Sequence, residues 1–162
     1  YFFKFLIVVT IIYRQFGVYA LRQISTMVRG VFCGSGVEGL QNPTVFREVL
    51  NLVGKPAASV KVLYVGTATY DIETYEASQC RRFVEAGCGV TALRVTGGKE
   101  VTAGAMREAV EGADVVLVSG GNTLYAVQRW KAIGLDKLLA EAAGRGCVMT
   151  GGAAGAVCWV TA

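Results

Sequence analysis

Residues 114–118 place the strongest constraint on the fold of this chain. The run Asp114-Val115-Val116-Leu117-Val118 is apolar at every position after the first. A strand of this composition is covered on both faces, which is typical of a parallel sheet between two layers of helices. The run therefore predicts a central strand of an α/β domain.

The rest of the chain alternates short apolar runs with segments of helical periodicity. We expect further strands at 28–33, 60–65, 89–95 and 147–150, and helices at 43–53, 74–86, 102–111, 122–133 and 135–143. Repeated strand–helix units with short connections predict a doubly wound parallel sheet, flavodoxin-like in type. A chain of 162 residues, 53% of them hydrophobic, can bury the core of one such domain.

In such a sheet, ligands bind beyond the carboxyl ends of the strands. Those ends lead here into segments 34–36, 66–69, 119–123 and 150–155, which are rich in small and hydroxyl-bearing residues. We expect a functional site where these segments meet.

Charge and cysteine usage argue against several classes of function. The net charge is +4, but the basic residues are scattered and do not alternate with aromatic ones, so a nucleic-acid partner is not expected. The five cysteines form no C-x-x-C pair and the sequence has no histidine, so we expect neither a metal site nor a cofactor. Unpaired cysteines in apolar runs favour a reducing, cytoplasmic setting.

Residues 1–26 differ in composition from the rest of the chain. The apolar run 5–13 is only about half of the ~20 residues that span a bilayer, so membrane association is not expected. We interpret 1–26 as an extension that is not part of the domain, and 27–162, opening at Met27, as the α/β domain.

Two glycine-rich motifs allow more than one interpretation. Gly34-x-Gly36-x-x-Gly39 matches a dinucleotide-binding fingerprint, but the helix expected from Pro43 begins too late for it. We interpret the motif as a flexible turn and keep nucleotide binding as an alternative. In 119–124, Asn122 or Thr123 caps the next helix, which by itself explains both residues.

Residues 150–159 carry the most specific pattern. Gly151 and Gly155 flank Ala153 as the glycines of G-x-S-x-G flank the serine of a nucleophile elbow, with an apolar run before and a helix-compatible run after. A glycine-rich turn without catalytic function would also explain these five residues taken alone.

The three segments together resemble the peptidase E family of serine peptidases, which includes α-aspartyl dipeptidases and cyanophycinases. The resemblance lies in Gly-Gly-(Ser→Ala)-Ala-Gly-Ala-Val-Cys-Trp at 151–159, Gly-Gly-Asn-Thr-Leu at 120–124 and, more loosely, Thr-Ala-Thr-Tyr-Asp at 67–71 with Tyr75. It implies hydrolysis of short, aspartyl-containing peptides. It assigns the oxyanion hole to the amides of Gly121 and Ala154, and substrate contacts to Asn122, Thr67 and Thr69. Similarity to class I glutamine amidotransferases is at the level of the fold.

The chain departs from this family at the nucleophile, where Ala153 replaces serine, and it ends at Ala162, before a downstream histidine and acid. We therefore expect an incomplete, catalytically inactive member, and an incomplete sheet predicts some self-association. The alternative is a non-catalytic α/β module that binds peptides or metabolites.

Overall fold

The computed structural model describes residues 28–97 and 101–161, and side chains as far as Trp159. The interpretation of 1–26 as an extension, and of Met27 as the start of the domain, concerns residues outside the described ones.

Five parallel strands form one sheet, in the order β1-β5-β4-β2-β3. The strands are β1 (Gly30–Cys33), β2 (Lys61–Val65), β3 (Gly89–Leu93), β4 (Val115–Val118) and β5 (Val148–Gly152).

The strand order is that of a doubly wound sheet. Strands β2 to β5 follow the flavodoxin-like arrangement, and β1, first in the chain, occupies the position beside β5. In the register, Val65 lies beside Val118, and Val118 lies beside Gly151. The central strands therefore end side by side, and the predicted α/β fold is confirmed.

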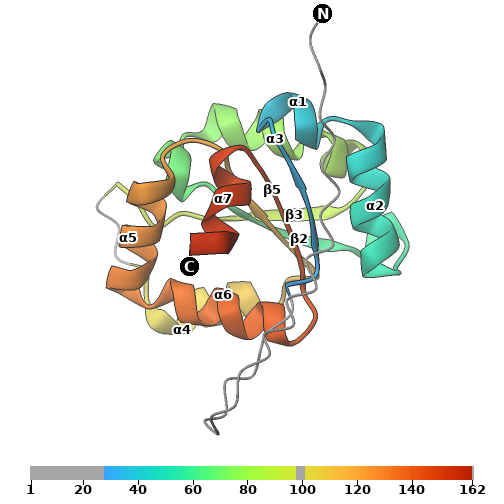
Figure 1. Cartoon of the computed structure of the whole chain (residues 1–162). Helices are drawn as coiled ribbons and strands as arrows, with labels where there is room; N and C mark the ends of the chain where they lie inside the picture. The colour runs from blue at the N-terminus through green and yellow to red at the C-terminus, as the bar shows by residue number, and fades with distance from the viewer. Residues whose placement is uncertain (1–27, 98–100, 162) are drawn as a thin grey trace, which may run out of the picture.

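Helices cover both faces of the sheet, as Figure 1 shows. One layer contains α1 (Val37–Leu40), α2 (Pro43–Val53) and α3 (Glu73–Glu85); the other contains α4 (Ala103–Glu111), α5 (Thr123–Ile133), α6 (Leu135–Gly144) and α7 (Ala154–Thr161). Single turns of 3-10 helix, η1 (Ala57–Ser59) and η2 (Thr67–Thr69), precede and follow β2.

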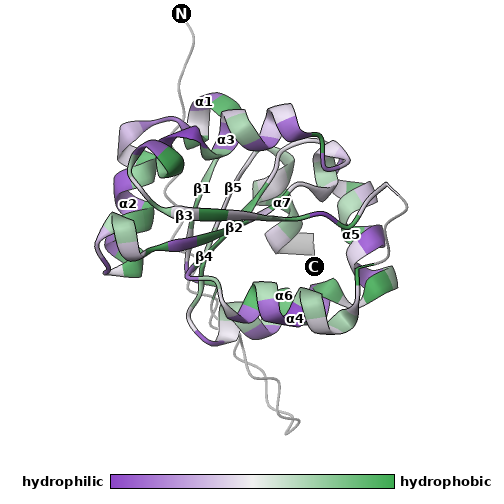
Figure 2. Ribbon diagram, turned by 180° about the vertical axis from the view of Figure 1, so that it is seen from behind, coloured by the Kyte–Doolittle hydropathy of each residue, from purple (hydrophilic) through white to green (hydrophobic). Residues whose placement is uncertain are grey.

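The apolar run of β4 supplies both halves of the core. Val115 and Leu117 pack into the cluster under α1 to α3, whereas Val116 and Val118 pack into the cluster under α4 to α7. All four side chains are fully buried, because alternate residues of a strand point to opposite faces. The helices carry both hydrophobic and hydrophilic residues (Figure 2), and their buried hydrophobic residues belong to these two clusters.

Local signals set the helix ends. The side chain of Asn42 accepts from the Thr44 N–H at the start of α2, and Gly54, with φ of 71°, ends that helix. Thr102 caps α4 in the same way. None of the helices in the described part of the chain is long and apolar enough to cross a membrane.

One prediction for the first turn was wrong. The segment after β1, interpreted as a flexible turn, contains the short helix α1. A side chain at Gly39 would lie 2.5 Å from the Cys33 sulfur, and one at Gly152 would lie 2.1 Å from the Ser35 carbonyl oxygen. Close packing between this turn and the end of β5 therefore accounts for small residues here without a nucleotide.

Candidate functional site

A single residue separates β5 from α7. Ala153 has φ of 52°, a left-handed conformation that is unfavourable for a residue with a side chain. Its N–H donates to the Cys33 carbonyl at 3.0 Å, and its own carbonyl accepts from the Ala156 N–H at 3.0 Å. The chain thus turns sharply from strand to helix and exposes the Ala153 methyl group at the carboxyl end of the sheet.

The two flanking glycines lie in close contact with neighbouring backbone. A Cβ atom at Gly155 would come within 2.2 Å of the Val118 carbonyl oxygen, and one at Gly151 within 2.6 Å of the Gly155 carbonyl oxygen. No side chain fits at either position unless the backbone shifts. The steric requirement for glycine two residues before and two after the central residue is that of a nucleophile elbow.

The loop after β4 passes directly beside this turn. A Cβ atom at Gly120 would lie 3.6 Å from the Ala153 Cβ and 3.1 Å from the Gly152 carbonyl oxygen. Gly121 follows with φ of 127°, and a Cβ atom at this position would lie 2.2 Å from the Ala68 carbonyl oxygen. The loops after β2, β4 and β5 therefore meet at one point.

Two backbone amides at this point have no protein partner among residues 28–97 and 101–161. Among the described residues, neither the Gly121 N–H nor the Ala154 N–H donates to another protein group, and both residues are at least partly exposed. Ala154 opens α7, so its amide also contributes to the positive end of the helix dipole. Both amides are free to donate to an anionic or carbonyl oxygen.

Asn122 holds the β4 loop in place. Its N–H donates to the Ala68 carbonyl at 2.8 Å, and its Oδ1 accepts from the Tyr125 N–H at 3.0 Å, which caps α5. Its Nδ2 donates to the Tyr70 hydroxyl at 3.2 Å. The exposed Asn122 side chain thus links the loops that follow β2 and β4.

The two threonines predicted to contact substrate point into the protein instead. Thr67 is fully buried, and its Oγ1 accepts from the Trp130 Nε1 at 2.9 Å. Thr69 is 8% exposed, and its Oγ1 donates to the Gly66 carbonyl at 2.9 Å. Burial and internal hydrogen bonds give both hydroxyls a structural function, and this corrects their assignment to substrate.

Sequence reasoning missed an unusual stretch of backbone next to these threonines. Tyr70 and Asp71 are consecutive left-handed residues, with φ of 56° and 57°. The Asp71 Oδ2 accepts from the Val95 N–H at 2.7 Å and from the Thr96 N–H and Oγ1 at 2.8 and 2.7 Å. Aspartate adopts a positive φ more often than most residues, but tyrosine rarely does, so the sequence did not indicate two consecutive left-handed residues.

Three ionisable side chains of β1, β2 and α7 have pKa values raised by burial. Burial raises the pKa of Tyr64 to about 12 and that of the Cys158 thiol to about 11. Burial also raises the pKa of Cys33, whose Sγ lies 3.6 Å from the Gly151 carbonyl oxygen beneath the turn. All three groups are therefore protonated near pH 7. The described residues contain no cluster of three metal-ligating side chains.

Comparison with known proteins places the chain in a family. The sequence model of peptidase family S51 matches residues 31–162. A Bacillus subtilis (strain 168) protein named uncharacterized peptidase YgaJ is 50% identical over 46 residues, which is 28% of this chain and 20% of that protein. A Trypanosoma brucei brucei protein named G2/mitotic-specific cyclin-1 is 35% identical over 75 residues, 42% of this chain and 22% of that protein.

A solved structure supports the fold. A Listeria monocytogenes EGD-e protein assigned to peptidase E superposes with a TM-score of 0.62 at 23% identity, covering 78% of this chain and 58% of that chain. The chain spans about a fifth of the length of the two curated relatives and just over half of the solved one. With most of its residues matched by the family model, the chain belongs to peptidase family S51.

Proposed function

We propose that this chain carries the peptide-binding half of a dipeptidase E-like serine peptidase site and does not itself cleave peptides. The observation that carries the proposal is the strained one-residue turn at Ala153, next to the amides of Gly121 and Ala154, which have no protein partner in the part of the chain that the structure describes. The ligand is a short peptide, and the resemblance implies an aspartyl dipeptide as the first to test.

The proposed geometry assigns a function to each part of the turn. In a relative with serine at this position, the hydroxyl oxygen attacks the peptide carbonyl while a base takes its proton, and the oxyanion accepts from two backbone amides. We assign those amides to Gly121 and Ala154. Each such donor, aimed at the developing charge, contributes about 3–4 kcal/mol to the transition state.

The same geometry explains why we expect no turnover. A methyl group has no lone pair with which to attack a carbonyl, so no acyl-enzyme forms at Ala153. The 162-residue sequence also contains no histidine to serve as the base. Hydrogen bonding to the peptide carbonyl does not depend on the hydroxyl, so binding survives the loss of chemistry.

An introduced thiol tests the assignment of the turn. Thiolates are nucleophilic without a dedicated base, and a helix N-terminus lowers the pKa of a nearby thiol. We expect the Ala153→Cys variant to be acylated by a peptide p-nitrophenyl ester, with the thiolate bonding to the carbonyl carbon and p-nitrophenolate leaving. A single added acyl group, found by mass spectrometry at the new cysteine, would be the product.

The matched control is Ala156→Cys, in the first turn of the same helix but outside the strand-to-helix turn at 151–155. We expect the introduced thiol at 153 to react at least about tenfold faster than that at 156, because the oxyanion amides act only at the turn. Equal rates for the two variants would remove the basis for the proposed oxyanion hole. Unmodified chain should show neither acylation nor peptide hydrolysis.

We also propose a reducing compartment such as the cytoplasm, because the five cysteines are free and buried. We also propose that the chain self-associates, as expected from the sequence. Sedimentation of the same preparations measures this. A concentration-independent monomer would contradict it.

A further inference from the structure

A cavity of about 240 Å³ lies at the amino edge of the sheet, opposite the edge that carries the elbow. Its walls come from the residues just before β1, β4 and β5 and from the end of α2 with the segment after it. Sites for drug-sized ligands measure about 300–1,000 Å³, so this cavity suits a smaller ligand. Ligands of parallel sheets usually bind at the carboxyl edge, and the proposed function does not use this cavity.

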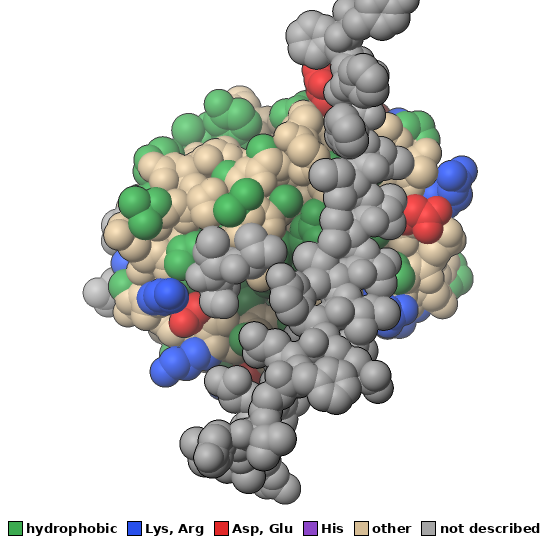
Figure 3. Space-filling view, in the orientation of Figure 1, with side chains coloured by type: hydrophobic (Ala, Val, Ile, Leu, Met, Phe, Trp, Pro, Cys, Tyr) green, Lys and Arg blue, Asp and Glu red, His purple; other side chains and the backbone are tan. Residues whose placement is uncertain are grey.

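Three basic side chains from separate parts of the chain line the cavity. Arg29 precedes β1, Lys55 follows α2, and Arg145 ends α6. On the face shown in Figure 3, by contrast, Lys and Arg side chains are scattered over the surface. The net charge of the whole chain is only +4, so three basic residues around one small cavity concentrate positive charge there.

Asp114 is the one carboxylate among the described residues that line the cavity, and its oxygens are already bonded. Its Oδ1 accepts from the Lys55 Nζ at 2.6 Å, and its Oδ2 accepts from the Lys61 N–H at 3.0 Å. The charges of Lys55 and Asp114 therefore offset each other. The positive charge left for a ligand is that of the two arginines.

Both arginine side chains are held in place without being neutralised. The Arg29 Nη2 donates to the Leu52 carbonyl in the last turn of α2, and the Arg145 Nη2 donates to the Val110 carbonyl in the last turn of α4, at 3.4 Å. Cations are favoured at helix carboxyl ends, which by itself explains these two contacts. Neither guanidinium forms an ion pair with a carboxylate of the described residues. A guanidinium has five N–H donors, so each arginine can also bind a ligand.

We propose that this cavity binds a phosphate group through Arg29 and Arg145. A phosphate monoester carries a charge of about −1.5 to −2 near pH 7 and offers three acceptor oxygens, which matches two guanidinium groups. The planar fork of arginine pairs with two oxygens of such a group. A carboxylate carries a single charge and would leave one arginine unpaired. The inference does not rest on the proposed function, because it concerns the opposite edge of the sheet.

Calorimetry on the full chain tests the site with inorganic phosphate, glycerol phosphate and acetate at one ionic strength. We expect both phosphate compounds to bind at least about tenfold more tightly than acetate, because each can pair with both arginines. Tighter binding of inorganic phosphate would identify the free ion as the ligand. Tighter binding of glycerol phosphate would identify a phosphate monoester, and either result supports the site.

Arginine variants assign the binding to the cavity. Arg29→Gln and Arg145→Gln should each weaken phosphate binding at least about tenfold, because each removes charge-assisted hydrogen bonds. Arg145→Lys keeps the charge but not the planar fork, so its affinity should lie between those of the unmodified chain and Arg145→Gln. Should Arg145→Gln fail to fold, Arg145→Lys and Arg29→Gln carry the test.

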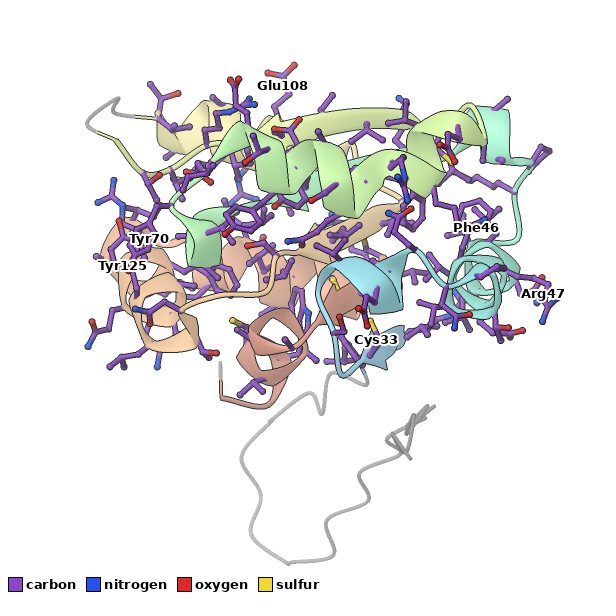
Figure 4. All side chains as sticks on the ribbon, turned by 90° about the horizontal axis from the view of Figure 1, so that it is seen from above. Cys33, Phe46, Arg47, Tyr70, Glu108 and Tyr125 are labelled. Carbon is purple, nitrogen blue, oxygen red and sulfur yellow. The ribbon has the colours of Figure 1, made fainter. Side chains whose placement is uncertain are left out.

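The matched control is Arg47→Gln, which removes the same charge elsewhere. Arg47 lies on the outer side of α2 and points away from the protein body (Figure 4), and it does not line the cavity. This variant should bind phosphate as the unmodified chain does. Equal weakening by Arg47→Gln and Arg145→Gln, or phosphate binding no tighter than that of acetate, would indicate an adventitious ion only and overturn the inference.

Amide resonances distinguish this cavity from the elbow, whose amides could also attract an anion. Phosphate should shift the amide resonance of Gly146, which lines the cavity, and leave those of Gly121 and Ala154 unchanged. Shifts confined to Gly121 and Ala154 would place the anion at the elbow and overturn the inference. Acylation of the Ala153→Cys variant tests the proposed function separately, so each proposal can fail without the other.

Discussion

Replacing Ala153 with glycine should leave the chain as stable as before or make it more stable. The left-handed conformation at Ala153 costs about 1–2 kcal/mol for a residue with a Cβ atom, and glycine removes that cost. Against this, glycine increases the entropy of the unfolded chain, which lowers stability by about 0.4–1 kcal/mol. The exposed methyl group contributes little burial. The net change for Ala153→Gly is therefore between zero and about 1.5 kcal/mol of added stability.

The same substitution three residues later should have the opposite effect. Ala156 lies inside α7, where glycine costs about 1 kcal/mol relative to alanine. Urea unfolding followed by circular dichroism should therefore rank the proteins Ala153→Gly, unmodified chain, Ala156→Gly, from most to least stable. Equal losses of about 1 kcal/mol in both variants would refute a strained turn at 153.

Three further predictions test the elbow and other parts of the fold. Gly155→Ala should destabilise the fold by about 1–3 kcal/mol or more, because its methyl group would lie 2.2 Å from the Val118 carbonyl oxygen. The control Gly104→Ala places its methyl group 4.0 Å from the nearest atom beyond its own helix backbone and chain neighbours, so it should be neutral or stabilising. Burial tends to raise the pKa of Asp114, but the hydrogen bonds from Lys55 and the Lys61 N–H outweigh it and hold that pKa below its usual value. The stabilisation by Asp114 is present above the unfolded pKa of about 3.9 and is lost as the pH falls through the lower folded pKa. The Asp114→Asn variant should therefore be less stable than the unmodified chain near neutral pH, and its stability should change less as the pH is lowered. Burial raises the pKa of Cys80 to about 12 and of Cys147 to about 11, so both thiols should resist a disulfide reagent in the folded chain and react once urea unfolds it.

The sequence predicted the architecture because its strongest signals are local. A wholly apolar β4 requires helices on both faces, and side chains such as Asn42 and residues such as Gly54 mark helix ends. Strand ends were less well predicted, since β3 stops at Leu93 rather than at 95. Val95 is nevertheless buried, and its N–H binds Asp71 instead of a neighbouring strand.

The site was harder to predict because its geometry depends on contacts between distant loops. Motif spacing located Ala153, Gly121 and Asn122 on converging strand ends, but it could not show that Thr67 would be buried against Trp130. The left-handed turn at Tyr70 was also not predicted. The Asp71 carboxylate that holds this turn accepts hydrogen bonds from residues 24 and 25 positions later in the chain.

The elbow keeps its shape for reasons that lie outside residue 153. Gly152 fits against the Ser35 carbonyl, Gly155 against the Val118 carbonyl, and the Ala153 N–H bonds to Cys33. Each contact comes from β1, β4 or the loop after β1, and none uses a hydroxyl at the turn. Replacing serine by alanine at such a position therefore removes the nucleophile without moving the amides of Gly121 and Ala154. In the proposed function, hydrogen bonding to the peptide carbonyl depends on backbone atoms and chemistry on the side chain at 153, so the proposed binding does not require a hydroxyl at the turn.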